Sequence, residues 1–374
     1  MTAPRPLLRH VWIVFLLLAA VAPWIVSPYE LSLLGRFLAL SILALGLVLV
    51  WGEAGILTLG QGVFFGLGGY VLAMHLKLAV LTPEEIPDFM TWSGRSELPW
   101  WWQPFTSPGV ALAAVIVVPG VCAALFAWAV FRRRVVGVYF ALITQALALC
   151  FATLLVSQQE STGGFNGLTD FSTLLGFDLA AKGTVWTLYW ITVAFVTLSF
   201  LGLRWLMRSR FGTMLRATRD GENRVRFLGH NPTPYKVFAF TISAMLAGIG
   251  GALFTLHAGV VSPALVGVVP SIEMVIWVAV GGRGSLWGAV AGTLLVNFAK
   301  DEISSALPDA WLYVLGVVFI LVVTLMPRGV AGVIEDALPR LRPASPRGKV
   351  ATVISPAGGA SRARSGLQPT RKCC

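Results

Sequence analysis

A polar, Arg-rich stretch, FGTMLRATRDGENRVRFLG at residues 211–229, lies near the middle of the chain between long apolar segments. Its less polar residues recur at the spacing of one helical face: Phe211, Met214, Leu215 and Thr218. Asp220-Gly221 would interrupt this amphipathic helix, and Gly229 would end a second, shorter turn. Such an element is marginally stable alone, and it gains stability when its apolar stripe and mixed charges fit a groove in another protein.

An alternative for this stretch is a loop that rests on lipid headgroups, as basic amphipathic segments often do. Asp220 and Glu222 argue against this alternative, because anionic lipids repel carboxylates. We therefore expect residues 209–235 to contact another protein.

Sites for catalysis or metal binding are not recognisable in the sequence. The four histidines are scattered, and neither paired carboxylates nor a catalytic triad is apparent. No G-x-x-x-x-G-K-[ST] phosphate-binding motif occurs, so the chain is not expected to hydrolyse ATP. We expect a protein that is not an enzyme.

The composition around this stretch is that of a membrane protein. Hydrophobic residues make up 56% of the chain and charged residues only 12%, against about 25% charged residues in soluble proteins. The segments that approach the length of about 20 apolar residues needed to cross a bilayer are 11–27, 31–51, 55–81, 109–131, 135–157, 184–206, 236–258 and 309–326. No alternation typical of a β-barrel competes with this pattern. The sequence predicts an all-α integral membrane protein, a polytopic bundle of about eight spanning helices.

A further apolar stretch, 271–300, is broken by GGRG at 281–284. Irregular backbone at membrane depth is tolerated where it is buried in protein or lines a cavity. We expect this segment to be re-entrant, so that it dips into the bilayer and returns to the same face.

The basic residues indicate the orientation of the chain. With the N-terminus inside, the arginines at 132–134 and 204–226 fall on the cytoplasmic side, as the positive-inside rule requires. The re-entrant segment then leaves the C-terminus inside as well. The net charge of +11 thus indicates topology in a membrane rather than binding of nucleic acid.

Residues 1–338 are expected to form one membrane domain. Residues 339–374 contain no acidic residue and are rich in Pro, Ala, Gly and Arg, which predicts a disordered basic cytoplasmic tail that contacts anionic lipid. The predicted outer loop at 158–183 contains GGFNGLTDF. Gly164, Asn166 and Asp170 are the candidate residues of this loop, and Asn166 would stabilise an outer turn, shape the entrance, or form a docking face.

Several stretches resemble the LivM-like permeases, the membrane subunits of branched-chain-amino-acid-type ABC importers. The stretches SRFGTMLRATRDGENRVRFLGHNP at 209–232 and YKVFAFTISAMLAGIGGALF at 235–254 resemble that family's cytoplasmic coupling loop and next helix, and LTLGQGVFFGLGGY at 57–70 resembles its Gly-rich helix. VYFALITQALAL at 138–149, GGFNGLTDF at 163–171 and IEMVIWVAVGGRGSLWGAVAGTLLVN at 272–297 are closer to the family's urea-transporter permease. The resemblance covers roughly residues 30–335.

The resemblance implies a permease that pairs with a second, related permease, two cytoplasmic ATPases that bind ATP, and a periplasmic solute-binding protein. It implies no cofactor in this chain. The coupling-loop residues implied by the match are Gly212, Arg216, Arg219, Asp220, Glu222, Arg224 and Gly229. Gly221 departs from the family pattern, in which Asn or another helix-tolerant residue is frequent, and this leaves the length of the loop's first helix open.

Polar groups inside the apolar segments are candidates for the solute path, because burying them in a bilayer is costly. They are Gln61, Thr144, Gln145, Glu273, Arg283 and Asn297. Amides and hydroxyls suit urea, although each also suits a hydrogen bond between helices. Arg283 would cap carbonyls freed by the GGRG break or face a water-filled path, with Glu273 as a partner.

Three functions remain open at this point. The resemblance favours the permease of a urea importer. The permease of a branched-chain amino acid importer is the alternative, and a passive channel or scaffold is a third interpretation that would not require the polar stretch at 209–232.

Overall fold

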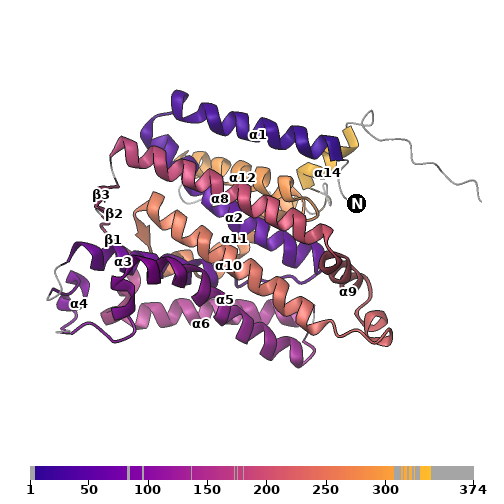
Figure 1. The fold of residues 1–374 in the computed structure, drawn as a ribbon, viewed down its shortest axis with the longest axis horizontal. Helices are drawn as coiled ribbons and strands as arrows, with labels where there is room; N and C mark the ends of the chain where they lie inside the picture. The colour runs from indigo at the N-terminus through magenta and orange to yellow at the C-terminus, as the bar shows by residue number, and fades with distance from the viewer. Residues whose placement is uncertain are drawn as a thin grey trace, which may run out of the picture. The chain divides into compact units, whose positions relative to one another are not determined.

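The computed structural model describes residues 5–81, 85–94, 97–135, 137–171, 173–174, 176–179, 181–306 and 329–337, with positions 313, 314, 316, 317, 320, 321 and 324. These residues are mostly helical (Figure 1). The longer helices are α1 (Arg5–Ile25), α2 (Pro28–Leu47), α3 (Gln61–Val80), α5 (Pro108–Arg132), α6 (Val138–Ser157), α8 (Lys182–Arg208), α9 (Arg210–Phe227), α10 (Thr233–Ala258), α11 (Val268–Gly281) and α12 (Leu286–Ala306). The shorter helical elements are η1 (Val48–Glu53), α4 (Asp88–Trp92), η2 (Gln103–Thr106), α7 (Gln159–Thr162), η3 (Gly164–Asn166), η4 (Pro263–Leu265) and α14 (Gly329–Ala337).

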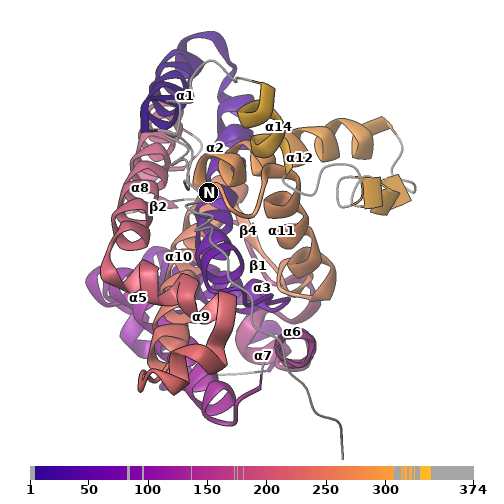
Figure 2. The ribbon, with the colours of Figure 1, turned by 90° about the vertical axis from the view of Figure 1, so that its right-hand side faces the viewer.

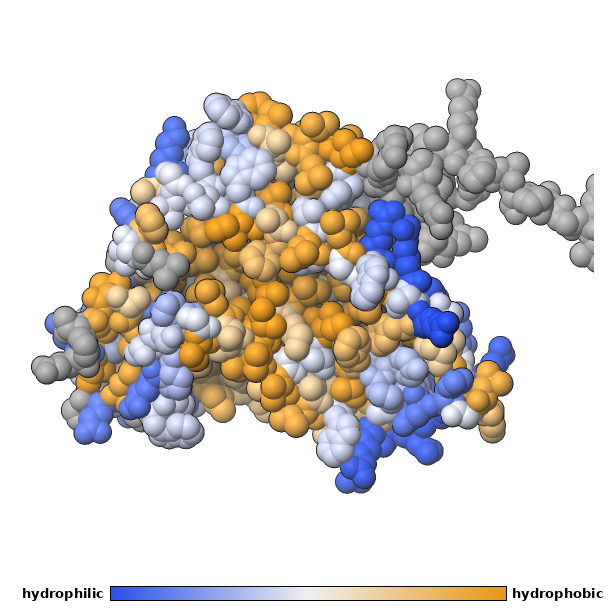
Figure 3. Space-filling model, in the orientation of Figure 1, coloured by the Kyte–Doolittle hydropathy of each residue, from blue (hydrophilic) through white to orange (hydrophobic). Residues whose placement is uncertain are grey.

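Six helices of the described chain are long and apolar enough to cross a bilayer: α2 together with η1, α3, α5, α6, α8 and α10. They correspond to six of the predicted spans. The first predicted span, 11–27, is α1, whose described apolar part is shorter, and 309–326 lies mostly outside the described residues. Apolar side chains cover the middle of the molecule, and hydrophilic ones gather at the end where α9 lies (Figure 3). The protein is therefore a polytopic helical membrane protein, as predicted.

Helix α10 lies at the centre of the bundle and packs against α2, α3 and α5 (Figures 1 and 2). The contact between α3 and α10 depends on glycine, because a Cβ added to Gly68 would lie 2.1 Å from the carbonyl oxygen of Gly248. Small residues at such positions let membrane helices approach until their backbones touch. The centre of the bundle is thus packed backbone to backbone.

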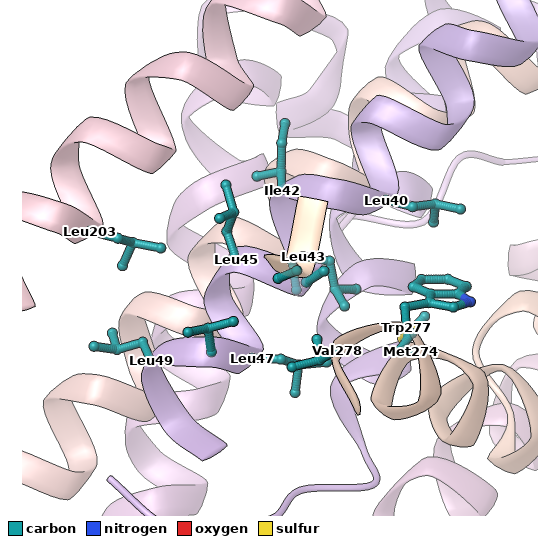
Figure 4. Packing of buried hydrophobic residues seen from close by; sticks show 14 of the residues in the cluster. Leu40, Ile42, Leu43, Leu45, Leu47, Leu49, Leu203, Met274, Trp277 and Val278 are labelled. Carbon is teal, nitrogen blue, oxygen red and sulfur yellow. The ribbon is translucent and has the colours of Figure 1, made fainter. Parts of the chain in front are cut away.

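Helix α2 contributes much of the apolar core. Its Leu40, Leu43 and Leu47 lie beside Trp277 and Val278 of α11 (Figure 4). By contrast, α5 and α6 keep large apolar side chains exposed along one side. Those faces are available to lipid or to another protein.

The connection from α2 to α3 is irregular. The π-helical turn η1 ends α2, residues 54–60 are largely non-helical, and α3 begins only at Gln61. Gln61 donates a hydrogen bond from Nε2 to Ser243 Oγ at 3.1 Å, and Ser243 lies ten residues, or about 15 Å, along α10 from Thr233. Helix α3 therefore begins inside the bundle, whereas the sequence predicted a span that starts at residue 55.

The predicted break in 271–300 falls at Gly282, whose φ of 111° favours glycine. Helix α11 ends at Gly281, α12 begins at Leu286, and the two helices pack against each other. They form a helical hairpin around the predicted break.

Two short antiparallel ladders lie at the end of the bundle away from α9 (Figure 1). Strand β1 (Leu168–Thr169) pairs with β4 (Val260–Val261), and β2 (Thr173–Leu174) pairs with β3 (Phe177–Asp178). The first ladder ties the loop after α6 to the segment that follows α10. We call this end the β1–β4 end and the opposite one the α9 end.

Candidate functional site

Helix α9 consists of two helical pieces joined at Gly221, whose ψ of 77° lies outside the helical range. At its start, Ser209 Oγ accepts a hydrogen bond from the Phe211 N–H at 3.2 Å, which is an N-cap. Leu215 and Thr218 are buried on the side that faces the bundle. The predicted interruption at Asp220-Gly221 is present. The predicted apolar stripe is also present, but it packs against the bundle of this chain, whereas the sequence predicted that it fits a groove in another protein.

Two arginines of α9 hold it to the turn η1. Arg216 Nη1 lies 2.9 Å from Glu53 Oε2, and Arg219 Nη1 donates to the carbonyl oxygen of Gly52 at 2.6 Å. The Glu53 side chain is only 8% exposed, so this carboxylate depends on Arg216 to balance its charge. These contacts connect α9 to the chain segment that leads to Gln61.

A second group of charges holds α9 to α10. Glu222 Oε1 accepts from Arg226 Nη2 at 2.8 Å, and Glu222 Oε2 accepts from Nζ of the buried Lys236. Burial tends to raise the pKa of Glu222, but the hydrogen bonds from Lys236 and Arg226 outweigh it and hold the pKa below its ordinary value. Glu222 is therefore a negative charge placed to attach α9 to α10.

Most of the other predicted coupling-loop residues face outward. Asp220, Arg224 and Gly229 are exposed, whereas Gly212 is buried at the start of α9. Two large apolar side chains are also exposed here, Phe227 at 89% and Leu228 at 78%. The sequence analysis did not predict that Phe227 and Leu228 are exposed. Their position outside the apolar stripe formed by Phe211, Met214, Leu215 and Thr218 could have indicated it.

A cavity of about 180 Å³ lies at the α9 end between α9, α10, the ends of α5 and α6, and residues 54–56. Its lining consists of Ala54, Gly55, Ile56, Phe131, Val135, Gly137, Phe140, Thr218, Arg219, Glu222 and Lys236. Charged groups and apolar groups therefore face the same small space.

The structure brings two of the predicted path residues together, Gln61 and Thr144. Thr144 Oγ1 accepts from the Leu59 N–H at 3.0 Å, immediately before α3 begins. The Oε1 atom of Gln61 is buried and has no hydrogen-bond partner within the part of the chain that the structure describes. An unpaired buried carbonyl is costly and suits a donor that arrives with a ligand. Gln145 is half-buried beside Thr144 on α6.

The other predicted path residues lie elsewhere. Glu273 accepts from Lys300 Nζ at 2.7 Å, so the predicted pairing of Glu273 with Arg283 is not formed. Arg283 is exposed at the α9 end, where its guanidinium carbon is 5.9 Å from the centre of the Trp51 ring. Asn297 donates to the carbonyl oxygen of Thr293 at 2.8 Å within its own helix.

The predicted outer-loop residues lie at the β1–β4 end. Gly164 and Asn166 form η3, directly before β1. Asp170 has a φ of 60° and accepts a hydrogen bond from Thr169 Oγ1 at 2.9 Å. These residues shape a turn, and Asn166 is exposed on it.

Comparisons with known proteins agree on one family. Residues 30–323 match the model described as "Branched-chain amino acid transport system / permease component". The high-affinity branched-chain amino acid transport system permease protein LivM of Salmonella typhimurium is 27% identical over 358 residues, which cover 90% of this chain and 76% of LivM. LivH of the same organism is 24% identical, and BraD of Pseudomonas aeruginosa is 23% identical; each match covers 78% of this chain and 91% of the relative. These relatives are named as transport permease proteins, and none of the three is named as an enzyme. No solved structure is detectably similar to the chain.

Proposed function

This chain belongs to the family of branched-chain amino acid transport system permease components, and we propose that it is the membrane-spanning subunit of an ATP-driven importer. Two cytoplasmic ATPases bind the ATP, a second related permease completes the membrane part, and a periplasmic binding protein delivers the solute. The chain itself carries no cofactor in this arrangement. The observation that carries the proposal is α9, a charged helical element anchored to the bundle on one side and exposed on the other.

The proposed orientation places the α9 end in the cytoplasm. Arg132 and Arg133 at the end of α5 and Arg208 and Arg210 beside the start of α9 belong to this end. Positive charges flank membrane spans mainly on the cytoplasmic side. Both termini are then cytoplasmic in an inner membrane; residues 339–374, proposed as a basic tail that contacts lipid, lie outside the described residues.

The exposed side of α9 is the proposed contact with an ATPase. Phe227 and Leu228 offer apolar surface at the end of the helix, and Asp220 and Arg224 offer charges beside it. Apolar anchors surrounded by polar residues are typical of protein interfaces. Membrane lipid is a poorer occupant, because Asp220 would face anionic headgroups.

Movement of α9 would reach the solute path through η1. Arg216 and Arg219 bind the turn that ends α2, and the chain then runs through residues 54–60 to Gln61. π-Helical turns occur frequently at functional sites. In this proposal a displacement of α9 shifts the start of α3 and thereby opens or closes the path at Gln61.

Branched-chain amino acids are the first proposed solutes, because the relatives' printed names specify them. Urea is a second candidate, supported by one observation. The polar groups around the start of α3 (Gln61, Thr144 and Ser243) are uncharged, and an amide carbonyl without a partner suits the N–H groups of a neutral solute.

The β1–β4 end is the proposed face for the periplasmic binding protein. Phe165 and Asn166 are exposed there, on a loop fixed by the β1–β4 ladder. A fixed loop suits docking because little conformational entropy is lost on binding.

The test is uptake of radiolabelled leucine and of urea into proteoliposomes that contain this chain with its partner permease, ATPases and binding protein. ATP-dependent accumulation of leucine, with no competition from urea, is expected. Accumulation of urea without accumulation of leucine would identify urea, instead of branched-chain amino acids, as the transported solute. Equilibration without ATP, unchanged by Arg219→Ala together with Glu222→Ala in an intact assembly, would indicate a passive channel.

A further inference from the structure

The cavity at the α9 end combines two cations with one carboxylate. Arg219 and Lys236 supply the positive charges and Glu222 the negative one. Lys236 is only 5% exposed, and its ammonium group carries three donors, one of which binds Glu222. Arg219 uses Nε for Asp220 and Nη1 for the Gly52 carbonyl, and its guanidinium has further N–H groups. The cavity thus offers both signs of charge within hydrogen-bonding reach of one small space.

The remaining lining is largely apolar. The rings of Phe131 and Phe140 stack with their centres 4.8 Å apart, and Ile56 and Val135 complete this wall. Binding of an aliphatic group against this wall is favourable, by about 25 cal/mol for each Å² of apolar surface removed from water. The volume of about 180 Å³ is below the range of roughly 300–1,000 Å³ usual for drug-sized ligands, so a small molecule is the fitting occupant.

We propose that this cavity binds a free zwitterionic amino acid with an apolar side chain from the cytoplasmic side. The carboxylate binds between Arg219 and Lys236, the ammonium group binds Glu222, and the aliphatic side chain lies against Phe140 and Ile56. The proposal rests on the proposed function for the orientation of the α9 end and for the solute class. It adds a site, distinct from the polar groups at Gln61, that α9, α10 and residues 54–56 build together.

The test is calorimetric titration of L-leucine into the assembled transporter in lipid nanodiscs, without the binding protein. Saturable binding is expected. 4-Methylpentanoate is leucine without the ammonium group, and isopentylamine is leucine without the carboxylate. Each should bind at least about tenfold more weakly than leucine, which corresponds to the loss of one charge-assisted hydrogen bond. Urea, which offers neither charge, should not compete.

Variants locate the site. Arg219→Gln and Lys236→Gln should each weaken leucine binding by about tenfold. The matched control is Arg226→Gln, because Arg226 also binds Glu222 but does not line the cavity, and it should retain binding. If size-exclusion chromatography shows that the Lys236→Gln transporter does not assemble, the leucine affinity of Arg219→Gln tests the site.

Three results would overturn the proposal: no binding of leucine, binding of 4-methylpentanoate equal to that of leucine, or unchanged leucine binding in Arg219→Gln. ATP-driven uptake of leucine, measured separately, distinguishes this outcome from a failure of the proposed function. Uptake without binding at the cavity rejects the site alone, whereas binding without uptake rejects the importer alone.

Discussion

Arg216 on α9 and Glu53 at the end of η1 form an ion pair although 163 positions separate them, with Nη1 2.9 Å from Oε2. Glu53 is buried and Arg216 is one-third exposed. The pair therefore lies at the surface of the bundle. It joins the charged helix α9 to η1, at the start of the irregular connection between α2 and α3. We expect it to matter for coupling as well as for folding.

Reversal of the charge at Glu53 should uncouple ATP hydrolysis from uptake. Glu53→Arg places two cations in contact, and we expect a loss of about 2–3 kcal/mol of stability, because one partner of the pair is buried. The double variant Glu53→Arg, Arg216→Glu restores opposite charges and should recover most of the uptake. If the double variant is no better than the sum of the two single ones, the pair does not transmit the movement.

The exposed apolar pair on α9 should be required for ATPase binding. Phe227→Ser and Leu228→Ser leave the isolated permease as stable as before, because both side chains are exposed, but should weaken association with the ATPase by about tenfold or more. Phe165→Ser is the matched control, since Phe165 is equally exposed at the β1–β4 end. Co-purification with the ATPase measures the effect, and equal losses in all three variants would contradict it.

Removal of the unpaired amide at Gln61 should affect the solute more than the fold. Gln61→Leu keeps the volume of the side chain and removes the unpartnered Oε1 atom, so uptake should fall through a higher KM, by about three- to tenfold. Ser41→Ala is the control, because Ser41 is also buried but binds only the Phe37 carbonyl of its own helix among the contacts described. An unchanged KM in Gln61→Leu would remove Gln61 from the path.

The backbone contact between α3 and α10 should not tolerate a side chain. Gly68→Ala places a Cβ 2.1 Å from the Gly248 carbonyl oxygen and should lower the free energy of unfolding by about 1–3 kcal/mol. Gly202→Ala, in α8, meets open space and should be neutral or stabilising by up to about 1 kcal/mol, because Ala favours a helix more than Gly does. Thermal unfolding in nanodiscs compares the two, and equal effects would mean that α3 and α10 are not packed this closely.

Acidification should loosen the attachment of α9 to α10. The pKa of Glu222 is lowered from its ordinary value of 4.5 in the folded protein. Its contribution to stability is therefore complete above about pH 4.5 and is lost as the pH falls through the lowered folded value. Glu222→Gln lacks this contribution, so the difference in melting temperature between wild type and variant should be constant near neutrality and shrink at acidic pH. A difference that grows on acidification would contradict the ion-pair arrangement.

The sequence alone predicted the long helices and the two helix interruptions, because each of them depends on residues that are close together in the chain. The length of the apolar runs gave the positions of the six long helices, and Asp220-Gly221 and the glycines at 281–284 gave the two interruptions. In each case the physical cause lies within a few residues: the length of an apolar run, the helix-interrupting Asp-Gly pair at 220–221, or the positive φ of Gly282, which glycine adopts readily.

Features that depend on distant contacts could not be predicted in this way. Nothing near residues 54–60 indicates that this apolar segment is irregular, because its conformation depends on Thr144 and on the packing of α10. The partner of Glu273 is Lys300, on the next helix, and Arg219 binds a backbone carbonyl at Gly52. Single-residue chemistry identified Gln61 and Thr144 as polar groups worth explaining, but only the fold brought them together.

Helix α6 is the least enclosed of the six long helices, yet Thr144 on its inner side touches the chain just before Gln61. A molecule that lies along the outer side of α6 is therefore separated from the start of α3 by the thickness of one helix. A change in conformation at the start of α3 would therefore alter the surface that α6 presents to a neighbouring subunit. Two subunits that pack through this helix could in this way couple their conformational changes directly.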